Sequence, residues 1–146
     1  MPRLLAALIL AAGACSLAAQ TPPKESPPPA TRESEFRKAI GAAWEGLATF
    51  CVKWKLKDEA LLAADEALAA DPANAKAKGA RDAAEKVGTG ALDSARKEYA
   101  KKLEATRKQA GGLWRQIAQD PVVAKDAAAR DAAWGRALEL DPKGNQ

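Results

Sequence analysis

The side chains that most often carry out chemistry in proteins are few in this sequence and form no reactive pairs. There is no histidine among the 146 residues. Imidazole general-base catalysis, histidine-activated cysteine or serine nucleophiles, and histidine-ligated metal sites are therefore excluded. The carboxylates are numerous, but none belongs to a paired catalytic motif, and there is no glycine-rich phosphate loop. We expect neither a catalytic centre nor a bound cofactor or metal.

Cys51 and a basic stretch are the other features that could react or bind. Cys51 lies on an apolar stripe, and free cysteine is often a small buried hydrophobe, which favours a core position over a reactive thiol. Residues 76–108 hold ten basic and five acidic side chains, a local charge of +5 against +4 for the whole chain. The two signs are interspersed, as on an ordinary solvated helix, and an exported protein seldom meets nucleic acid, so a nucleic-acid partner is not expected.

The first residues have the layout of a secretory signal. A short positive start at Arg3 precedes the apolar run from Leu4 to Ala14, with small residues continuing to Ala19. The run is shorter than the ~20 residues of a membrane-spanning helix. We expect a cleaved leader over residues 1–19 and a periplasmic or extracellular protein. In an alternative, Cys15 is lipidated and tethers the protein to a membrane, because Ala12–Cys15 resembles a lipobox that lacks the usual leucine.

A proline-rich linker is predicted for residues 20–34, ahead of a helical domain over residues 35–146. Five of the nine prolines fall in this stretch, which favours an extended, semi-rigid spacer. A proline-rich ligand for another protein is the alternative.

The elements behind the linker are all predicted to be helices. Apolar residues from Phe36 to Trp54 recur at spacings of three and four, as on one face of a helix. A second helix is predicted from Lys57 to Ala70, where Asp71-Pro72 stops it. A third runs over 73–86, and a long fourth one begins near Leu92, with a kink or boundary allowed at Gly111-Gly112. Asp120-Pro121 is predicted to cap and open a last helix, which ends at Asp141-Pro142.

Several of these features recur seventy residues apart. Trp44, Ala67-Leu68 and Asp71-Pro72 return as Trp114, Ala137-Leu138 and Asp141-Pro142. Helix ends and aromatic positions therefore repeat together.

This register resembles the tetratricopeptide repeat, a family of stacked helical hairpins. The first copy matches at six of eight positions, and Cys51 and Ala64 stand where aromatics are usual. The second copy is looser, with Pro121 and Arg130 at two departing positions. The matching positions are Trp44, Leu47, Ala48, Ala60, Ala67 and Pro72, then Trp114, Ile117, Ala118, Trp134, Ala137 and Pro142. The resemblance implies hairpins in a short α-solenoid or a small helical bundle, with Trp44 and Trp114 in the core.

The resemblance also implies a function, the binding of a protein or peptide in a groove lined by the first helix of each pair. The positions carried over for that groove are Glu45, Thr49, Lys53, Arg115 and Gln119. The interpretation is an exported, non-catalytic scaffold or adaptor. The alternative is a self-associating helical bundle or coiled coil, because fewer than three repeats leave apolar faces that need cover.

Overall fold

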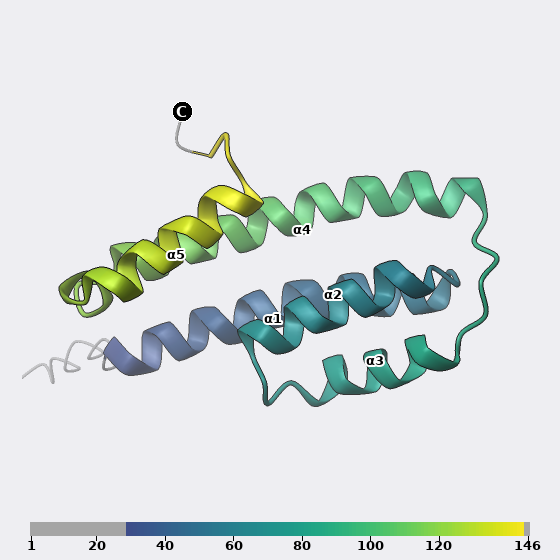
Figure 1. Cartoon of the computed structure of the whole chain (residues 1–146), viewed down its shortest axis with the longest axis horizontal. Coiled ribbons are helices and arrows are strands. Elements are labelled where there is room, and N and C mark those ends of the chain that lie inside the picture. Colours follow the sequence, from purple (N-terminus) through teal and green to yellow (C-terminus); the bar gives the residue numbers. More distant parts are fainter. Residues whose placement is uncertain (1–28, 145–146) are drawn as a thin grey trace, which may run out of the picture.

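The computed structural model describes residues 29–144 and is all-α over that range, as the composition predicts. Its helices form a small bundle (Figure 1). In chain order they are α1 (Pro29–Lys53), α2 (Lys57–Ala70), α3 (Ala75–Lys86), α4 (Asp93–Gln119), the short 3-10 helix η1 (Val123–Lys125) and α5 (Ala127–Leu140). The predicted leader over 1–19, Cys15 and linker residues 20–28 lie outside the described residues. None of the described helices is long and apolar enough to span a bilayer.

Helix α1 begins earlier than the sequence predicts. The extended linker was predicted up to Ser34, but α1 starts at Pro29, so that prediction is wrong for residues 29–34. Proline has a φ close to the helical value, and its missing N–H is not needed in the first turn. No further proline follows before Pro72. The last proline of the run therefore opens the helix.

The long fourth helix is confirmed, and the fifth helix begins later than predicted. α4 continues through Gly111 and Gly112 to Gln119 without a boundary. Asp120 does not cap the last helix; it follows α4, and its carboxylate accepts a hydrogen bond from the N–H of Val122 at 2.9 Å. Aspartate favours turns as readily as helix starts, and here the turn is followed by the buried Val123.

The true N-cap of α5 is Asp126. Its carboxylate accepts hydrogen bonds from the N–H groups of Ala128 and Ala129 at 3.0 and 3.2 Å. We expect Asp126→Ala to lower the free energy of unfolding by about 1 kcal/mol, because these donors lose their acceptor. Urea denaturation followed by circular dichroism measures the change. Asp82→Ala, at an exposed position inside α3, is the control and should change stability by less than about 0.5 kcal/mol. Equal losses in the two variants would refute the capping role.

The sequence repeat is also a structural repeat. α2 and α5 begin and end at positions seventy apart, and each packs against the long helix before it. Gly41 and Gly111 lie where the helices of each pair come closest. A Cβ added at either glycine would lie 2.8 Å from the Cβ of Asp71 or Asp141, respectively. Because only glycine permits this approach, the two hairpins share one packing geometry.

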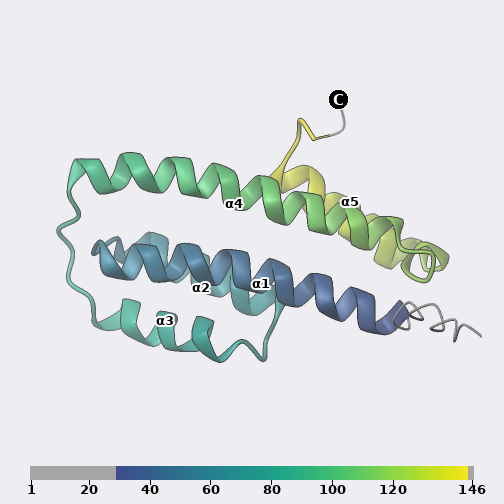
Figure 2. The ribbon, with the colours of Figure 1, turned by 180° about the vertical axis from the view of Figure 1, so that it is seen from behind.

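The two hairpins are related by an approximate half-turn. α1 and α4 lie side by side and run in opposite directions (Figures 1 and 2). Accordingly, Arg37 in the first half of α1 lies 5.0 Å from the ring centre of Trp114 late in α4. Lys102 in the first half of α4 lies 5.2 Å from the ring centre of Phe50 late in α1. Neighbouring units of a solenoid differ by only a small rotation, so these two pairs form a bundle.

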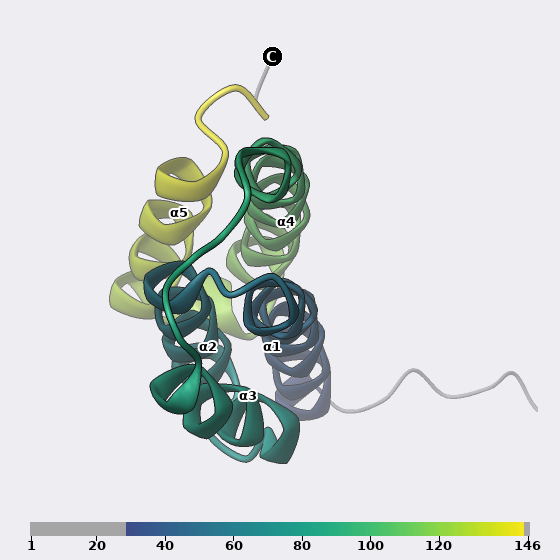
Figure 3. The ribbon, with the colours of Figure 1, turned by 90° about the vertical axis from the view of Figure 1, so that its right-hand side faces the viewer.

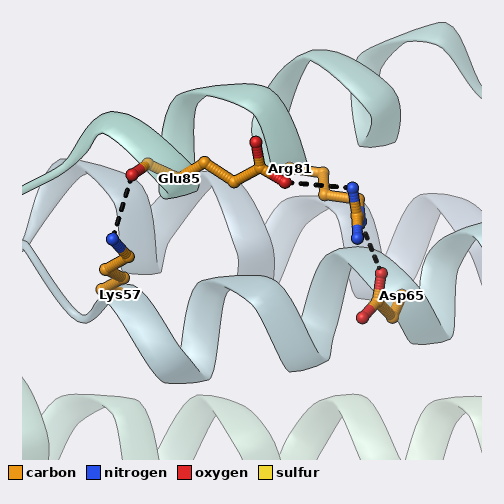
Figure 4. A network of polar contacts seen from close by, with 4 residues as sticks. All are labelled: Lys57, Asp65, Arg81 and Glu85. Carbon is orange, nitrogen blue, oxygen red and sulfur yellow. Dashed lines mark hydrogen bonds and ion pairs between the residues drawn. The ribbon is translucent and has the colours of Figure 1, made fainter.

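Helix α3 covers one side of the first hairpin (Figure 3). Ala77 and Ala84 are its buried residues. Arg81 donates a hydrogen bond to Asp65 of α2 at 2.8 Å, and the Lys57 ammonium donates one to the Glu85 carbonyl at 3.0 Å (Figure 4). The contact between α3 and the hairpin therefore combines buried alanines with polar contacts. No helix of the described residues covers the second hairpin in the same way.

The core is built mainly from alanine. Most of its buried residues are alanines, and the largest fully buried side chains are Ile40, Cys51, Leu56 and Ile117. Small side chains let helices approach closely but remove little apolar area each, at about 25 cal/mol per Å². The few large core residues therefore carry an unusual share of the stability.

Candidate binding groove

A groove runs along the first half of α4. It consists of two adjoining cavities of about 740 and 410 Å³. Tyr99, Leu103 and Arg107 of α4 and Leu140 of α5 line both cavities, so the two lie next to each other. α2 forms one wall, and the end of α5 with the turn 141–144 forms the other. We call this feature the α4 groove.

The α4 groove exists because the backbone of α2 lies close to α1 and α3 but not to α4 or α5, which α2 reaches through the long side chains of the Arg96–Glu59 and Arg136–Glu66 ion pairs. Leu62 of α2 points into it and is 66% exposed, a high value for a leucine. Tyr99 and Leu103 are half-buried along the same strip. Trp44 forms part of the floor at 5% exposure, and its indole Nε1 has no hydrogen-bond partner among the described residues. The groove therefore has an apolar base and an apolar strip, with charged side chains on both sides.

The carboxylates of the walls are held in internal ion pairs. Arg136 of α5 pairs with Glu66 of α2 and with Glu139, and so joins the two hairpins. Burial lowers the pKa of Arg136, but the two carboxylates more than offset this effect and the pKa is raised. Arg136 therefore stays charged and holds both acids.

The other two wall carboxylates are also engaged. Asp65 pairs with Arg81 at 2.8 Å. The Arg115–Asp141 pair, at 2.6 Å, is largely shielded from solvent, with side chains 15% and 13% exposed. Each of the four wall carboxylates therefore already has an arginine partner within the chain.

The remaining charged side chains of the groove are mostly cations. Arg107, Lys108 and Lys143 line it, together with one acid, Glu104. No ion pair joins any of these four to another residue of the described range, and all four are exposed. These four unpaired side chains together carry a net positive charge, which is available to a partner.

The half-turn places an equivalent, smaller cavity in the other half of the bundle. It measures about 150 Å³ and has Trp114 where the α4 groove has Trp44. Arg37 lies over the Trp114 ring, and its Nε donates to Glu33 at 2.8 Å. The positions equivalent to Arg37 and Glu33 are Arg107 and Leu103. Leucine cannot accept that hydrogen bond, so Arg107 lacks the partner that holds Arg37.

Tyr99 supplies a polar group in the middle of the apolar strip. Burial raises the pKa of Tyr99, with smaller contributions from Cys51 and Glu59 and an opposing one from Arg107. The phenol therefore stays protonated at neutral pH and can donate a hydrogen bond.

The groove positions carried over from the tetratricopeptide resemblance lie elsewhere. Thr49 and Lys53 are exposed on α1, and Glu45 is half-buried one turn earlier. On α4, Gln119 is exposed, and Arg115 is bound to Asp141. None of the five lines the α4 groove or the cavity at Trp114. A binding role for these five residues stays a prediction. The sequence signal for the α4 groove was limited to an apolar stripe through Leu103.

The tryptophans and the basic stretch divide between core and surface. Trp44 and Trp114 are buried, as predicted. Trp54 is 41% exposed and lies beside Phe50, with ring centres 6.3 Å apart, while Trp134 is half-buried. The basic side chains of residues 76–108 are shared between α3 and α4, two helices that do not pack together, so they form no common face.

Cys51 is buried in the core, as predicted. Burial, with a smaller contribution from Glu59, raises the pKa of its thiol to about 12. The thiolate is the reactive form, so the native thiol should be inert.

We expect Cys51 of the native protein to resist iodoacetamide at pH 8 and to react fully in denaturant. Peptide mapping by mass spectrometry measures alkylation at Cys51 separately from Cys15. The raised pKa also means that the unfolded thiol ionises first, so its contribution to stability is present below about pH 9 and declines as the pH rises towards 12. Rapid alkylation under native conditions would show that the site opens.

The described residues contain no group of three or more cysteine, aspartate or glutamate side chains placed to hold a metal ion. No family model matches the chain, and no curated protein or solved structure shows significant similarity to it. The assignment of function therefore depends on the geometry of the bundle and its groove.

Proposed function

We propose that this protein is an exported, non-catalytic scaffold or adaptor that binds a protein or peptide through its helix faces. The observation that carries the proposal is the α4 groove, an open apolar strip bordered by free charged side chains. Grooves with an apolar strip are a recurring means by which proteins bind helical segments of their partners. Leu62, exposed at the edge of this strip, would be covered by a partner.

We further propose that both hairpins are of tetratricopeptide type, joined here in a bundle. In support, Ala48, Ala60 and Ala67, the small positions of the first copy, are fully buried. Their equivalents Ala118 and Ala137 are buried as well. Arg130 stands where the repeat pattern has a small residue, and it is half-buried, which fits the looser match of the second copy.

Site-specific photo-cross-linking tests the binding proposal. A photoreactive amino acid at position 62 faces the α4 groove, and one at position 138 is the control, because Leu138 is also exposed but lies outside the groove. We expect position 62 to capture a partner, identified by mass spectrometry, that binds the purified protein reversibly and is not captured from position 138. If neither position gives an adduct, the proposal fails.

Self-association is the second candidate, because one face of the second hairpin is uncovered. In the first hairpin, α3 covers the corresponding face. Leu68 of α2 lies on that face together with Lys57 and Asp65, which both contact α3. Its equivalent Leu138 is 47% exposed. Light scattering after size-exclusion chromatography measures the mass. A dimer that Leu138→Lys converts to a monomer would favour this candidate, and a monomer at high micromolar concentration would exclude it.

The proposed export can be tested at the N-terminus. Mass spectrometry of the protein recovered from its native host should show a start near Ala19 or Gln20 if the leader is cleaved as predicted. A start at a lipid-modified Cys15 would favour the membrane-tethered alternative. An uncleaved Met1 would contradict both.

A further inference from the structure

We propose that the α4 groove receives an acidic amphipathic helix of a partner protein. This inference rests on the proposed binding function and specifies the chemistry of the partner. Three features of the groove support it: its backbone, its apolar strip and its unpaired charges.

The backbone of the groove favours a helix over an extended peptide. Its walls are helices, whose N–H and C=O groups are satisfied internally except at the ends. An added strand would find no sheet edge with which to pair. Recognition must therefore use side chains, as when an amphipathic helix lies in a groove.

The side chains of α4 that line both cavities have the length and spacing that such a helix requires, with two apolar residues followed by a cation. Tyr99, Leu103 and Arg107 are four residues apart and share one face of α4. They span about 12 Å along the helix at about 1.5 Å per residue. Leu62 on one wall and Leu140 on the other widen the strip. A partner helix with apolar residues at i, i+3 or i+4, and i+7 covers the same length.

The unpaired charged side chains of the groove favour a partner helix of negative charge. The wall carboxylates are engaged by arginines, which leaves Arg107, Lys108 and Lys143 against Glu104. The equivalent cavity shows how an arginine here can be satisfied, because Arg37 is held by Glu33. Arg107 has Leu103 in place of that glutamate. A carboxylate of the partner would supply the missing acceptor, and complementary charge speeds and directs association.

Two synthetic helical peptides of about 16 residues test the inference. Both carry the same leucine stripe; one has glutamates and the other lysines on its flanks. Fluorescence anisotropy of each labelled peptide is measured against the purified full-length chain. We expect the acidic peptide to bind at least tenfold more tightly than the basic one, with an affinity that falls as salt rises.

Charge reversal locates the binding. We expect Arg107→Glu with Lys108→Glu to weaken the acidic peptide at least tenfold. The control is Lys76→Glu with Lys78→Glu, exposed on α3 outside the groove, which makes the same change in net charge and should alter binding less than twofold. Leu62→Ser should also weaken the acidic peptide, because it shortens the apolar strip. Circular dichroism confirms that each variant is folded.

Other outcomes overturn the inference. Equal binding of the two peptides, tighter binding of the basic one, or no binding of either rejects an acidic helix as the occupant. Equal losses in the groove and α3 variants would show a general charge effect and reject the site. A partner that is cross-linked from position 62 but is insensitive to Arg107→Glu with Lys108→Glu keeps the binding function and rejects the acidic partner.

Discussion

Replacing Gly111 with alanine lowers the free energy of unfolding by about 2 kcal/mol, within the range for overpacking a close contact. The new Cβ would lie 2.8 Å from the Asp141 Cβ and 3.3 Å from the Ala137 carbonyl oxygen. Neither atom is the free end of a flexible side chain, so α4 and α5 must move apart. The movement also strains the Arg115–Asp141 ion pair. Urea denaturation followed by circular dichroism measures the loss.

The adjacent glycine provides a matched control. A Cβ at Gly112 would meet nothing within 4 Å. Gly112→Ala should therefore raise stability by about 0.5–1 kcal/mol, because alanine is the better helix former. Gly41→Ala and Gly46→Ala repeat the contrast in the first hairpin, where only Gly41 faces a close contact. Stabilisation by alanine at all four positions would contradict the tight approach.

Removing the Trp44 side chain should cost about 3–5 kcal/mol, because it leaves a large cavity in a core of small residues. Domain stability is typically about 5–15 kcal/mol, so Trp44→Ala threatens folding itself. Trp44→Phe should cost much less. Phenylalanine keeps most of the ring contacts, and it removes an unpaired buried N–H whose desolvation costs about 1–3 kcal/mol.

Urea denaturation of both Trp44 variants tests this difference. Trp54→Ala is the control, because Trp54 is partly exposed and its loss should be well under half of that for Trp44→Ala. If Trp44→Phe were as costly as Trp44→Ala, the indole N–H would have a hydrogen-bond partner in solution.

The helices could be predicted from the sequence because their signals are local. The apolar spacing from Phe36 to Trp54 and the stop at Asp71-Pro72 locate α1 and α2 without knowledge of the rest of the chain. The errors in the predicted helix boundaries also come from the local nature of the signals. Pro29 and Asp120 each suit more than one local structure, and neighbouring residues decided between them.

The α4 groove could not be predicted, because its walls come from three helices. The tetratricopeptide resemblance led to Glu45, Thr49 and Lys53 on α1 and to Arg115 and Gln119 on α4. Those positions presume hairpins that stack in one direction, and the half-turn between them arranges the faces differently. Leu62 and Tyr99 are far apart in the sequence and line the same cavity only in the folded chain.

By itself, the sequence determined that the protein is helical, that it lacks histidine chemistry, and that its hairpin features recur seventy residues apart. The first two properties depend on composition and local spacing, and the third is found by comparing the chain with itself. Only the tertiary structure decided that α1 and α4 run antiparallel, that Arg37 lies over the Trp114 ring in the smaller cavity, and that the equivalent cavity beside Trp44 is larger. The physical reason is that the direction in which two similar hairpins pack depends on contacts between distant side chains, which local periodicity does not encode.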